Sequence, residues 1–374
     1  MSELVNLYGL TRSQLEELFI GQGLQSFRGR QLMKWIYHSG ITDFSTMTDL
    51  PVITREWLLG YAELCLPNVV FQQKSSDGTV KWAIQVHEDE CVEMVLIPEK
   101  GRNTLCVSSQ VGCSLDCSFC STGKQGFNGN LSTAEIIGQL LVANEYLKSK
   151  NEAVTNVVFM GMGEPLLNFE SVLAAVDIMM DDMAFGLSKR KVTISSSGVV
   201  PAIEKLSSYT DCSLAISLHA PNDGLRDELV PINRRYPINA LLVACQKYLK
   251  TLGPHRKLLF EYTLIDQVND EPSHAKELAG LLGGIPCKIN LIPFNPFDQS
   301  GYRTPELSRV LAFQSILINR GYTAMIRSTR GEDIAAACGQ LAGNVRDRTK
   351  RSVRYRESRS SSQILVSERQ EVTG

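Results

Sequence analysis

Several features that define other protein classes are missing from this sequence of 374 residues. No stretch approaches the roughly 18 consecutive apolar residues that a membrane-spanning helix needs, and no basic region followed by an apolar run marks a signal peptide at the start. The formal net charge is only −2, so the chain is not a polycation that binds nucleic acid over its whole surface. No internal repeat is evident. We therefore expect a cytoplasmic protein without a membrane segment, in a compartment where thiols stay reduced.

The ten cysteines are too few for a disulfide scaffold in a chain of this length, and they are unevenly spread. Four of them, Cys106, Cys113, Cys117 and Cys120, lie within 15 residues. In a reducing compartment such a cluster indicates metal or redox chemistry. The other six are isolated and are by default small buried apolar residues. They are Cys65, Cys91, Cys212, Cys245, Cys287 and Cys338.

The chain divides into three parts. Residues 1–95 predict an accessory α+β domain, with apolar residues at helical spacing and an Asp77-Gly78 hairpin turn. Residues 96–345 alternate strand-like runs with helical stretches, one of which begins with the capping box of Ser132 and Glu135. Residues 346–374 form a basic tail whose end we expect to be disordered.

The alternation in the middle part predicts a parallel sheet with helices outside it. Six units suggest an incomplete (β/α)6 barrel, in which the chemistry lies at the carboxyl ends of the strands. The expected strands are Thr104–Ser108, Asn156–Met160, Lys191–Ser195, Ser213–Ser217, Leu258–Leu264 and Lys288–Pro293.

The strongest chemical signal is the spacing Cys-x-x-x-Cys-x-x-Cys of Cys113, Cys117 and Cys120. Three thiolates on one short loop can bind three corners of a cubic 4Fe-4S cluster and leave the fourth iron open to a ligand. Structural zinc is the alternative. A structural zinc ion needs a fourth protein ligand, and no His or Cys follows these three cysteines at zinc-finger spacing.

Other polar residues directly follow the expected strands. They include the turn Gly161-Met-Gly-Glu164-Pro165 and the dipeptide Leu218-His219. Taken alone, a glycine-rich strand end is usually only a turn, and a lone His is more often a satisfied core residue.

The cysteine spacing, with Phe119 before the last Cys, resembles that of the radical S-adenosylmethionine superfamily. Within it, the chain is similar to the methyltransferases that modify carbon 2 of an adenine in 23S ribosomal RNA and in certain transfer RNAs. The similarity covers nearly the whole chain and weakens after about Arg359. It is carried by Thr104–Cys113, Gly161–Asn168, Ser195–Val199, Ile216–Asp223, Asn290–Pro296 and Gly331–Gly343, and by Met33–Tyr37 and Ser75–Gly78 in the accessory region.

The resemblance implies a radical mechanism. Carbon 2 of adenine is electron-poor and its hydrogen is not acidic. This carbon therefore cannot act as the nucleophile that ordinary displacement at the S-adenosylmethionine methyl group requires. In this family one S-adenosylmethionine molecule methylates a Cys, and the radical made from a second molecule activates that methyl group. The activated carbon then adds to the adenine, linking protein and RNA. A second Cys releases the product and forms a disulfide.

Individual residues take family roles by their positions in these motifs. Cys338 matches the methyl-carrying Cys, Cys106 the resolving Cys and Glu93 the proton acceptor. Without the resemblance, Cys338 would be interpreted as a buried helix residue, Cys106 as a packing residue in a strand, and Glu93 as a solvated carboxylate on a strand. The positions that match cofactor contacts are Gly163, Glu164, Ser195, Ser217, Leu218, His219 and Asn295.

The partners implied are 23S ribosomal RNA, transfer RNA and an electron donor for the cluster, and we expect a monomer. Two stretches have local support for RNA binding: Arg28–His38, which mixes basic and aromatic residues, and the tail, with seven basic residues from Arg346 to Arg359. Either stretch could instead be a solvated helix face. Three alternatives stay open: the related class that methylates carbon 8 of the same ribosomal adenine, a radical enzyme acting on a small molecule, and a non-catalytic iron–sulfur protein that binds RNA.

Overall fold

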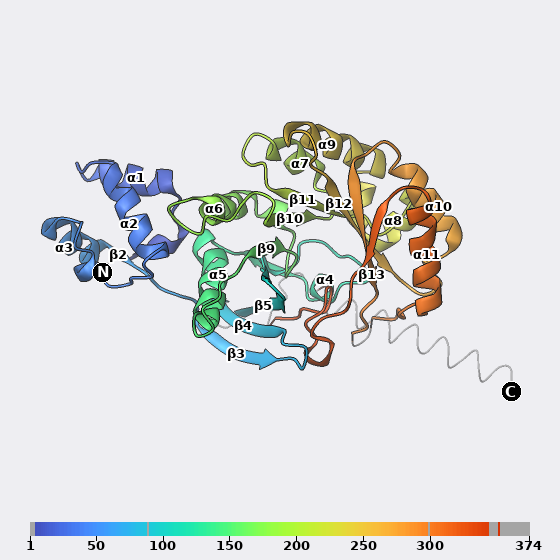
Figure 1. Cartoon of the computed structure of the whole chain (residues 1–374), viewed down its shortest axis with the longest axis horizontal. Coiled ribbons are helices and arrows are strands. Elements are labelled where there is room, and N and C mark those ends of the chain that lie inside the picture. Colours follow the sequence, from blue (N-terminus) through green and yellow to red (C-terminus); the bar gives the residue numbers. More distant parts are fainter. Residues whose placement is uncertain (1–3, 88–89, 298–299, 344–350, 352–374) are drawn as a thin grey trace.

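Ten strands form one continuous sheet, in the order β14-β13-β12-β11-β10-β9-β6-β5-β4-β3 (Figure 1). The computed structural model describes residues 4–87, 90–297, 300–343 and 351. The strands are β3 (Val69–Lys74), β4 (Val80–His87), β5 (Glu90–Glu99), β6 (Arg102–Cys106), β9 (Asn156–Phe159), β10 (Val192–Ser196), β11 (Ser213–Ser217), β12 (Leu258–Leu264), β13 (Cys287–Pro293) and β14 (Thr323–Ile326).

The strands from β6 to β14 pair in parallel and alternate with helices, which confirms the expected partial barrel. The six expected strands are all present. Strand β14 was not expected from sequence, because it is short and half exposed and so lacks the apolar run of a central strand. The helices of this part are α4 (Ser121–Lys124), α5 (Thr133–Lys148), α6 (Phe169–Met180), α7 (Val200–Leu206), α8 (Asp223–Leu229), α9 (Ile238–Thr251), α10 (Pro272–Leu281) and α11 (Leu307–Asn319).

Local sequence signals account for two of these boundaries. Ser132 caps α5, accepting a hydrogen bond from the Glu135 backbone while the Glu135 side chain returns one, as the capping box predicted. The β3–β4 turn contains Gly78 with φ +88°, a conformation that favours glycine. The Asp77-Gly78 hairpin is therefore confirmed.

Strands β3, β4 and β5 extend the barrel sheet on its β6 side by antiparallel pairing. The structure thus joins these strands, which the sequence analysis had placed in the accessory region, to the catalytic sheet. Residue 95, the boundary expected from sequence, lies inside β5. This extension matters for function because it lies beside the C-terminal segment that contains Cys338 (Figure 1).

Residues 4–64 form a small helical unit beside α5 and α6 (Figure 1). Arg12 bonds to the carboxylates of Asp181 and Asp182, tying this unit to the barrel. Its elements are α1 (Arg12–Gly21), α2 (Phe27–Tyr37), α3 (Val52–Tyr61) and the short parallel pair β1 (Val5–Asn6) and β2 (Ala62–Glu63). None of the helices in the described ranges is both long and apolar enough to cross a membrane.

Candidate active site

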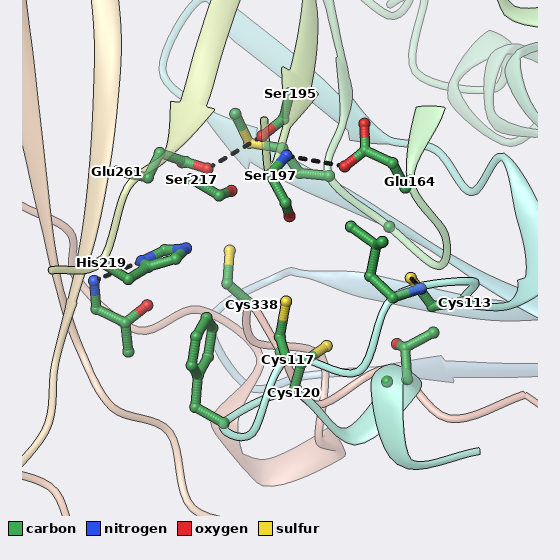
Figure 2. A pocket seen from close by; sticks show the side chains of 18 of the residues that line it. Cys113, Cys117, Cys120, Glu164, Ser195, Ser197, Ser217, His219, Glu261 and Cys338 are labelled. Atoms are coloured by element: carbon green, nitrogen blue, oxygen red, sulfur yellow. Dashed lines mark hydrogen bonds between the residues drawn. The ribbon is translucent and has the colours of Figure 1, made fainter. Parts of the chain in front are cut away.

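A cavity opens at the carboxyl ends of the parallel strands, where the sequence analysis placed the chemistry (Figure 2). The three cysteines of the spaced motif line it together with residues that follow β9, β10, β11 and β13. Of the ten predicted metal and cofactor residues, nine lie in its wall. They are Cys113, Cys117, Cys120, Gly163, Glu164, Ser195, Ser217, His219 and Asn295.

The three motif thiols fit an iron–sulfur cluster better than a single metal ion. Within the described ranges, no three His, Cys, Asp or Glu side chains approach closely enough to hold one ion. A cubic cluster needs no such convergence, because each thiolate binds a different iron. Burial, together with the neighbouring thiols, raises the pKa of Cys117 to about 12 and that of Cys113 well above its usual value. Thiolates here therefore need a cation, and bound iron supplies one.

The glycine-rich turn after β9 is shaped by close approach to its neighbours. Gly163 has φ +99°, and a Cβ there would stand 2.5 Å from Cβ of Gln110, so only glycine fits. The next residue, Glu164, is buried and accepts a 2.8 Å hydrogen bond from the backbone N–H of Ser197. Burial raises the pKa of this carboxyl. The turn thus holds a buried carboxylate at the cavity wall, where it can receive the ammonium group of an amino acid.

His219 is held in an unusual backbone conformation, with φ +59°. Its Nδ1 accepts a 3.0 Å hydrogen bond from the Thr263 backbone, so Nε2 carries the proton. Its ring meets Phe119 edge-on, with 4.6 Å between ring centres. Burial, reinforced by the positive charge of Arg226, lowers the pKa of His219 to about 3. The ring is therefore a neutral hydrogen-bond donor inside the cavity.

Leu218 is placed differently from its neighbours. Over the described part of the chain, Leu218 lines neither of the two cavities of the site. Its side chain is fully buried in the core. Its carbonyl accepts a hydrogen bond from Arg226 Nε at 3.0 Å. Any role toward a cofactor would have to come from its backbone.

A second cavity lies on the other side of Cys338, toward β14 and β6. Cys106 lines this second cavity, and Cys338 lines both cavities, as does Asn295. The Asn295 amide donates to the Cys338 carbonyl at 3.3 Å. Figure 2 shows the Cys338 thiol directed into the first cavity beside Ser217 and His219. Cys338 therefore stands at the junction between the cluster cysteines and Cys106.

The two unusual thiols are close enough to influence one another. Desolvation by the surrounding protein raises the pKa of Cys338 to about 11, although its side chain is open to the cavities, and the nearby Glu261 carboxylate adds to the effect. The pKa of Cys106 is raised further, by burial and then by the charge of Cys338. All ten cysteines, each of which lies in the described ranges, are free thiols. The disulfide expected from sequence is thus not formed in this structure.

Glu93 is the one predicted catalytic residue that, over the described residues, lines neither of the two cavities of the site. Its carboxylate pairs with Lys81 at 3.0 Å and accepts a 2.8 Å hydrogen bond from the Ala342 backbone. Its carbonyl accepts a hydrogen bond from Ser108 Oγ at 2.5 Å. Glu93 therefore contacts the segment that contains Cys338 through the backbone of Ala342, and not through the thiol.

Two buried charges at the site had no sequence signal. Arg226 is fully buried and donates to the carbonyls of Leu218, Ser217 and Ser197, thereby joining two strand ends. Glu261, in the middle of β12, lines the first cavity and receives a 3.4 Å hydrogen bond from Ser195 Oγ (Figure 2). Both stand in otherwise unremarkable stretches, so only the fold reveals them.

The basic tail lies outside the described residues except for Arg351, and Arg351 contacts the cluster loop. Its guanidinium donates to the carbonyls of Cys113, Ser114, Leu115 and Gly123 at 2.9–3.2 Å. Four acceptors on one planar group fix the path of this loop. At least one tail arginine therefore contacts the cysteine loop, whereas either RNA contact or a solvated face was expected for the tail from sequence.

Replacing Arg351 by Gln should loosen that loop. Losing a charged donor to several carbonyls costs about 1–3 kcal/mol, so hydrogen exchange over residues 113–124 of the iron-free protein should accelerate. After reconstitution the variant should hold less iron than the wild type. Arg320→Gln, on the exposed end of α11, is the charge-matched control and should change neither quantity. Unchanged exchange in Arg351→Gln would show that the contact does not shape the loop.

The Arg28–His38 stretch is divided between packing and exposure. The Tyr37 ring lies tilted against Phe185, with 5.0 Å between ring centres, and Trp35 donates a hydrogen bond to Asp49. Arg30 and Lys34, one helical turn apart on α2, are exposed. Arg30 pairs with Glu16 at 3.5 Å, but both cations are exposed enough to meet phosphates. Trp35 stabilises the helical unit itself, whereas Tyr37 packs the unit against the barrel.

Comparison with known proteins gives a consistent result. Residues 5–64 match the ribosomal RNA large subunit methyltransferase N-terminal domain, and residues 107–279 match the radical SAM superfamily. A protein of Pseudomonas putida named dual-specificity RNA methyltransferase RlmN is 55% identical over 94% of this chain and 93% of its own length. A Pseudomonas fluorescens protein of the same name is also 55% identical, with the same coverage of both chains.

Among solved structures, the crystal structure of a radical SAM methyltransferase from Sphaerobacter thermophilus is similar to this chain with a TM-score of 0.83. The two sequences are 41% identical, and the match covers 90% of this chain and 99% of the other. The similarity therefore extends over the helical unit and the barrel together.

Proposed function

This chain belongs to the RlmN family of radical S-adenosylmethionine RNA methyltransferases, and from that premise we propose that it methylates carbon 2 of an adenine in 23S ribosomal RNA and in transfer RNA through Cys338. The observation that carries the proposal is the place of Cys338 between two cavities, one with the cluster cysteines and one with Cys106. A methyl carrier needs access to its donor on one side and to its acceptor on the other.

The first cavity suits the cluster and the cofactor. Cys113, Cys117 and Cys120 would hold the iron, and the cluster, when bound, would supply the electron that cleaves S-adenosylmethionine to a radical. Glu164 would receive the cofactor's ammonium group, and His219 Nε2–H would donate a hydrogen bond to an acceptor atom elsewhere on the cofactor. Because Gly163 has no side chain, the cofactor could approach the backbone there closely. The other residues proposed to contact the cofactor are Ser195, Ser217, Asn295 and the backbone of Leu218. Two cofactor molecules would be used in each turnover.

The second cavity suits the adenine. It is bordered by Arg102, Arg327 and Arg330, which can meet phosphates, and it leads to Cys106 and Cys338. After the methyl carbon has joined the base, Cys106 would attack the Cys338 sulfur of the thioether and break its bond to that carbon. The electron pair of the broken bond would leave with the carbon, which takes up a proton to become the methyl group, so that a Cys106–Cys338 disulfide and free RNA result. The base must leave its stack to enter, as in other enzymes that modify bases. For Glu93 the role of proton acceptor stays a prediction.

The product distinguishes this proposal from its neighbours. RNA from cells with and without the gene should be digested to nucleosides and separated by mass and retention. We expect 2-methyladenosine to be lost from both ribosomal and transfer RNA when the gene is absent, and to return with the wild-type gene but not with Cys338→Ala. Loss of 8-methyladenosine instead would establish the related carbon-8 class. No change in either nucleoside would favour a small-molecule substrate or a non-catalytic protein.

We further propose that the enzyme acts as a monomer in the cytoplasm, where its RNA substrates are found, with a cellular reductant for the cluster. Cations on α2 and in the tail would add attraction to phosphates that does not depend on sequence.

A further inference from the structure

The segment that carries Cys338, residues 331–343, is attached at both ends to the β3–β5 extension of the sheet (Figure 1). Near its start, the Asp333 carboxylate accepts a 2.6 Å hydrogen bond from Ser75 Oγ in the β3–β4 turn. At its end, Gly343 passes so close to Cys91 in β5 that an added Cβ would stand 2.0 Å from the Cys91 carbonyl oxygen. The sheet extension therefore serves as the platform for this segment.

An ion pair lies between the platform and the middle of the segment. Lys81 of β4 and Glu93 of β5 stand 3.0 Å apart, with side chains only 10% and 11% exposed. Lys81 Nζ also donates to the Ala335 carbonyl at 3.3 Å, and Glu93 Oε2 accepts from the Ala342 backbone N–H at 2.8 Å. The two charges thus contact the backbone three residues before Cys338 and four residues after it.

The point that Lys81 contacts is strained. Ala335 has φ +49° and ψ +47°, the left-handed conformation that non-glycine residues adopt only when the surrounding structure enforces it. This turn sets the direction in which the chain continues to Cys338. A hydrogen bond from a buried ammonium group to the Ala335 carbonyl is a direct means of enforcing it.

We infer that Lys81, paired with Glu93, is a positioning residue for Cys338. It holds the segment in the conformation that places the thiol at the junction of the two cavities. A buried ion pair contributes little net stability compared with apolar residues of similar volume, because both ions lose water. The value of this pair lies in its two bonds to the segment. The inference rests on the proposed role of Cys338 as methyl carrier.

The test uses the double variant Lys81→Met/Glu93→Gln in the full chain. Removing both charges avoids an unpaired buried ion, so the thermal unfolding midpoint should stay near that of the wild type. Hydrogen exchange over residues 335–342 of the iron-free protein should accelerate by about tenfold or more, because the segment loses its bond to Lys81. The amide oxygen that Glu93→Gln keeps is also a weaker, uncharged acceptor for the Ala342 N–H. In reconstituted protein, methylation of Cys338 without RNA, followed by mass spectrometry, should slow by about a hundredfold because the thiol is misplaced.

Two further variants sharpen the result. Lys74→Met removes an exposed cation from neighbouring β3 and should leave exchange and Cys338 methylation unchanged. Ala335→Gly, added to the double variant, lowers the cost of the left-handed turn and should restore several-fold of the lost methylation rate. Wild-type exchange and wild-type Cys338 methylation in the double variant would overturn the inference.

Single variants separate positioning from proton transfer. If Glu93 serves only as a proton acceptor, Glu93→Gln should methylate Cys338 at the wild-type rate and accumulate protein–RNA adduct, and Lys81→Met should behave as the wild type. If the pair positions the segment, both single variants should slow Cys338 methylation itself. Should the wild type never methylate Cys338, the proposed function fails, but accelerated exchange in the double variant would still establish the structural contact.

Discussion

Replacing Cys106 by Ala should leave the enzyme joined to its RNA. Cys338 would still be methylated and its carbon would still add to the adenine, but no second thiol would release it. A denaturing gel should show a slow band that is sensitive to nuclease and resistant to thiol reductants, because a thioether is not a disulfide. Cys106 lines the cavity on the side of Cys338 away from the cluster cysteines, where the adenine is expected to bind. Without its thiol, nearly all enzyme that has added once to RNA should accumulate in this band.

Cys338→Ala provides the matched comparison. It should acquire no methyl group and give no adduct, although its iron content should equal that of the wild type. The double variant should also lack the band, because trapping requires Cys338 first. An adduct in Cys338→Ala and none in Cys106→Ala would mean that the two roles are exchanged.

Replacing Cys117 by Ala should abolish every iron-dependent activity. Protein purified without oxygen should be brown in the wild type, with about four irons per chain, and the variant should lose the colour and all cleavage of S-adenosylmethionine. The expected loss is large because two thiolates cannot hold the three corners of the cluster. Cys113→Ala and Cys120→Ala should behave alike.

Cys287→Ala is the control for the cysteine variants. Cys287 is also buried, but it begins β13, at the opposite end of that strand from Pro293 and Asn295. Its replacement removes one sulfur from the core and should leave iron content and activity intact. A colourless Cys117→Ala protein that still cleaves the cofactor, or an active wild type loaded with zinc, would contradict the assignment of the cluster.

Features encoded by neighbouring residues could be predicted from the sequence. The Asp77-Gly78 turn, the capping box of Ser132 and Glu135, and the spacing of the cluster cysteines each depend on residues a few positions apart. Such signals hold because backbone conformation and local hydrogen bonds determine them. The polar strand ends also came together as expected, since parallel strands present their carboxyl ends at one edge.

Contacts between distant parts of the chain could not be predicted in this way. Lys81 reaches Ala335 across 254 residues, and Arg351 reaches Cys113 across 238. The burial of Arg226 and Glu261 depends on how several strands converge, and no spacing in the sequence records it. These long-range bonds shape the segments that carry the cysteines, while the cysteines themselves were evident from motif and family.

The central claim, that the methyl group reaches RNA by way of Cys338, can be tested by isotope order in a single turnover. Enzyme should first be methylated with S-adenosylmethionine labelled in the methyl group, freed of excess cofactor, and then given RNA, reductant and unlabelled cofactor. We expect the first methylated adenine to carry the label, and Cys338 to lose an equal amount of label. A first product with an unlabelled methyl group, while Cys338 keeps its label, would contradict it.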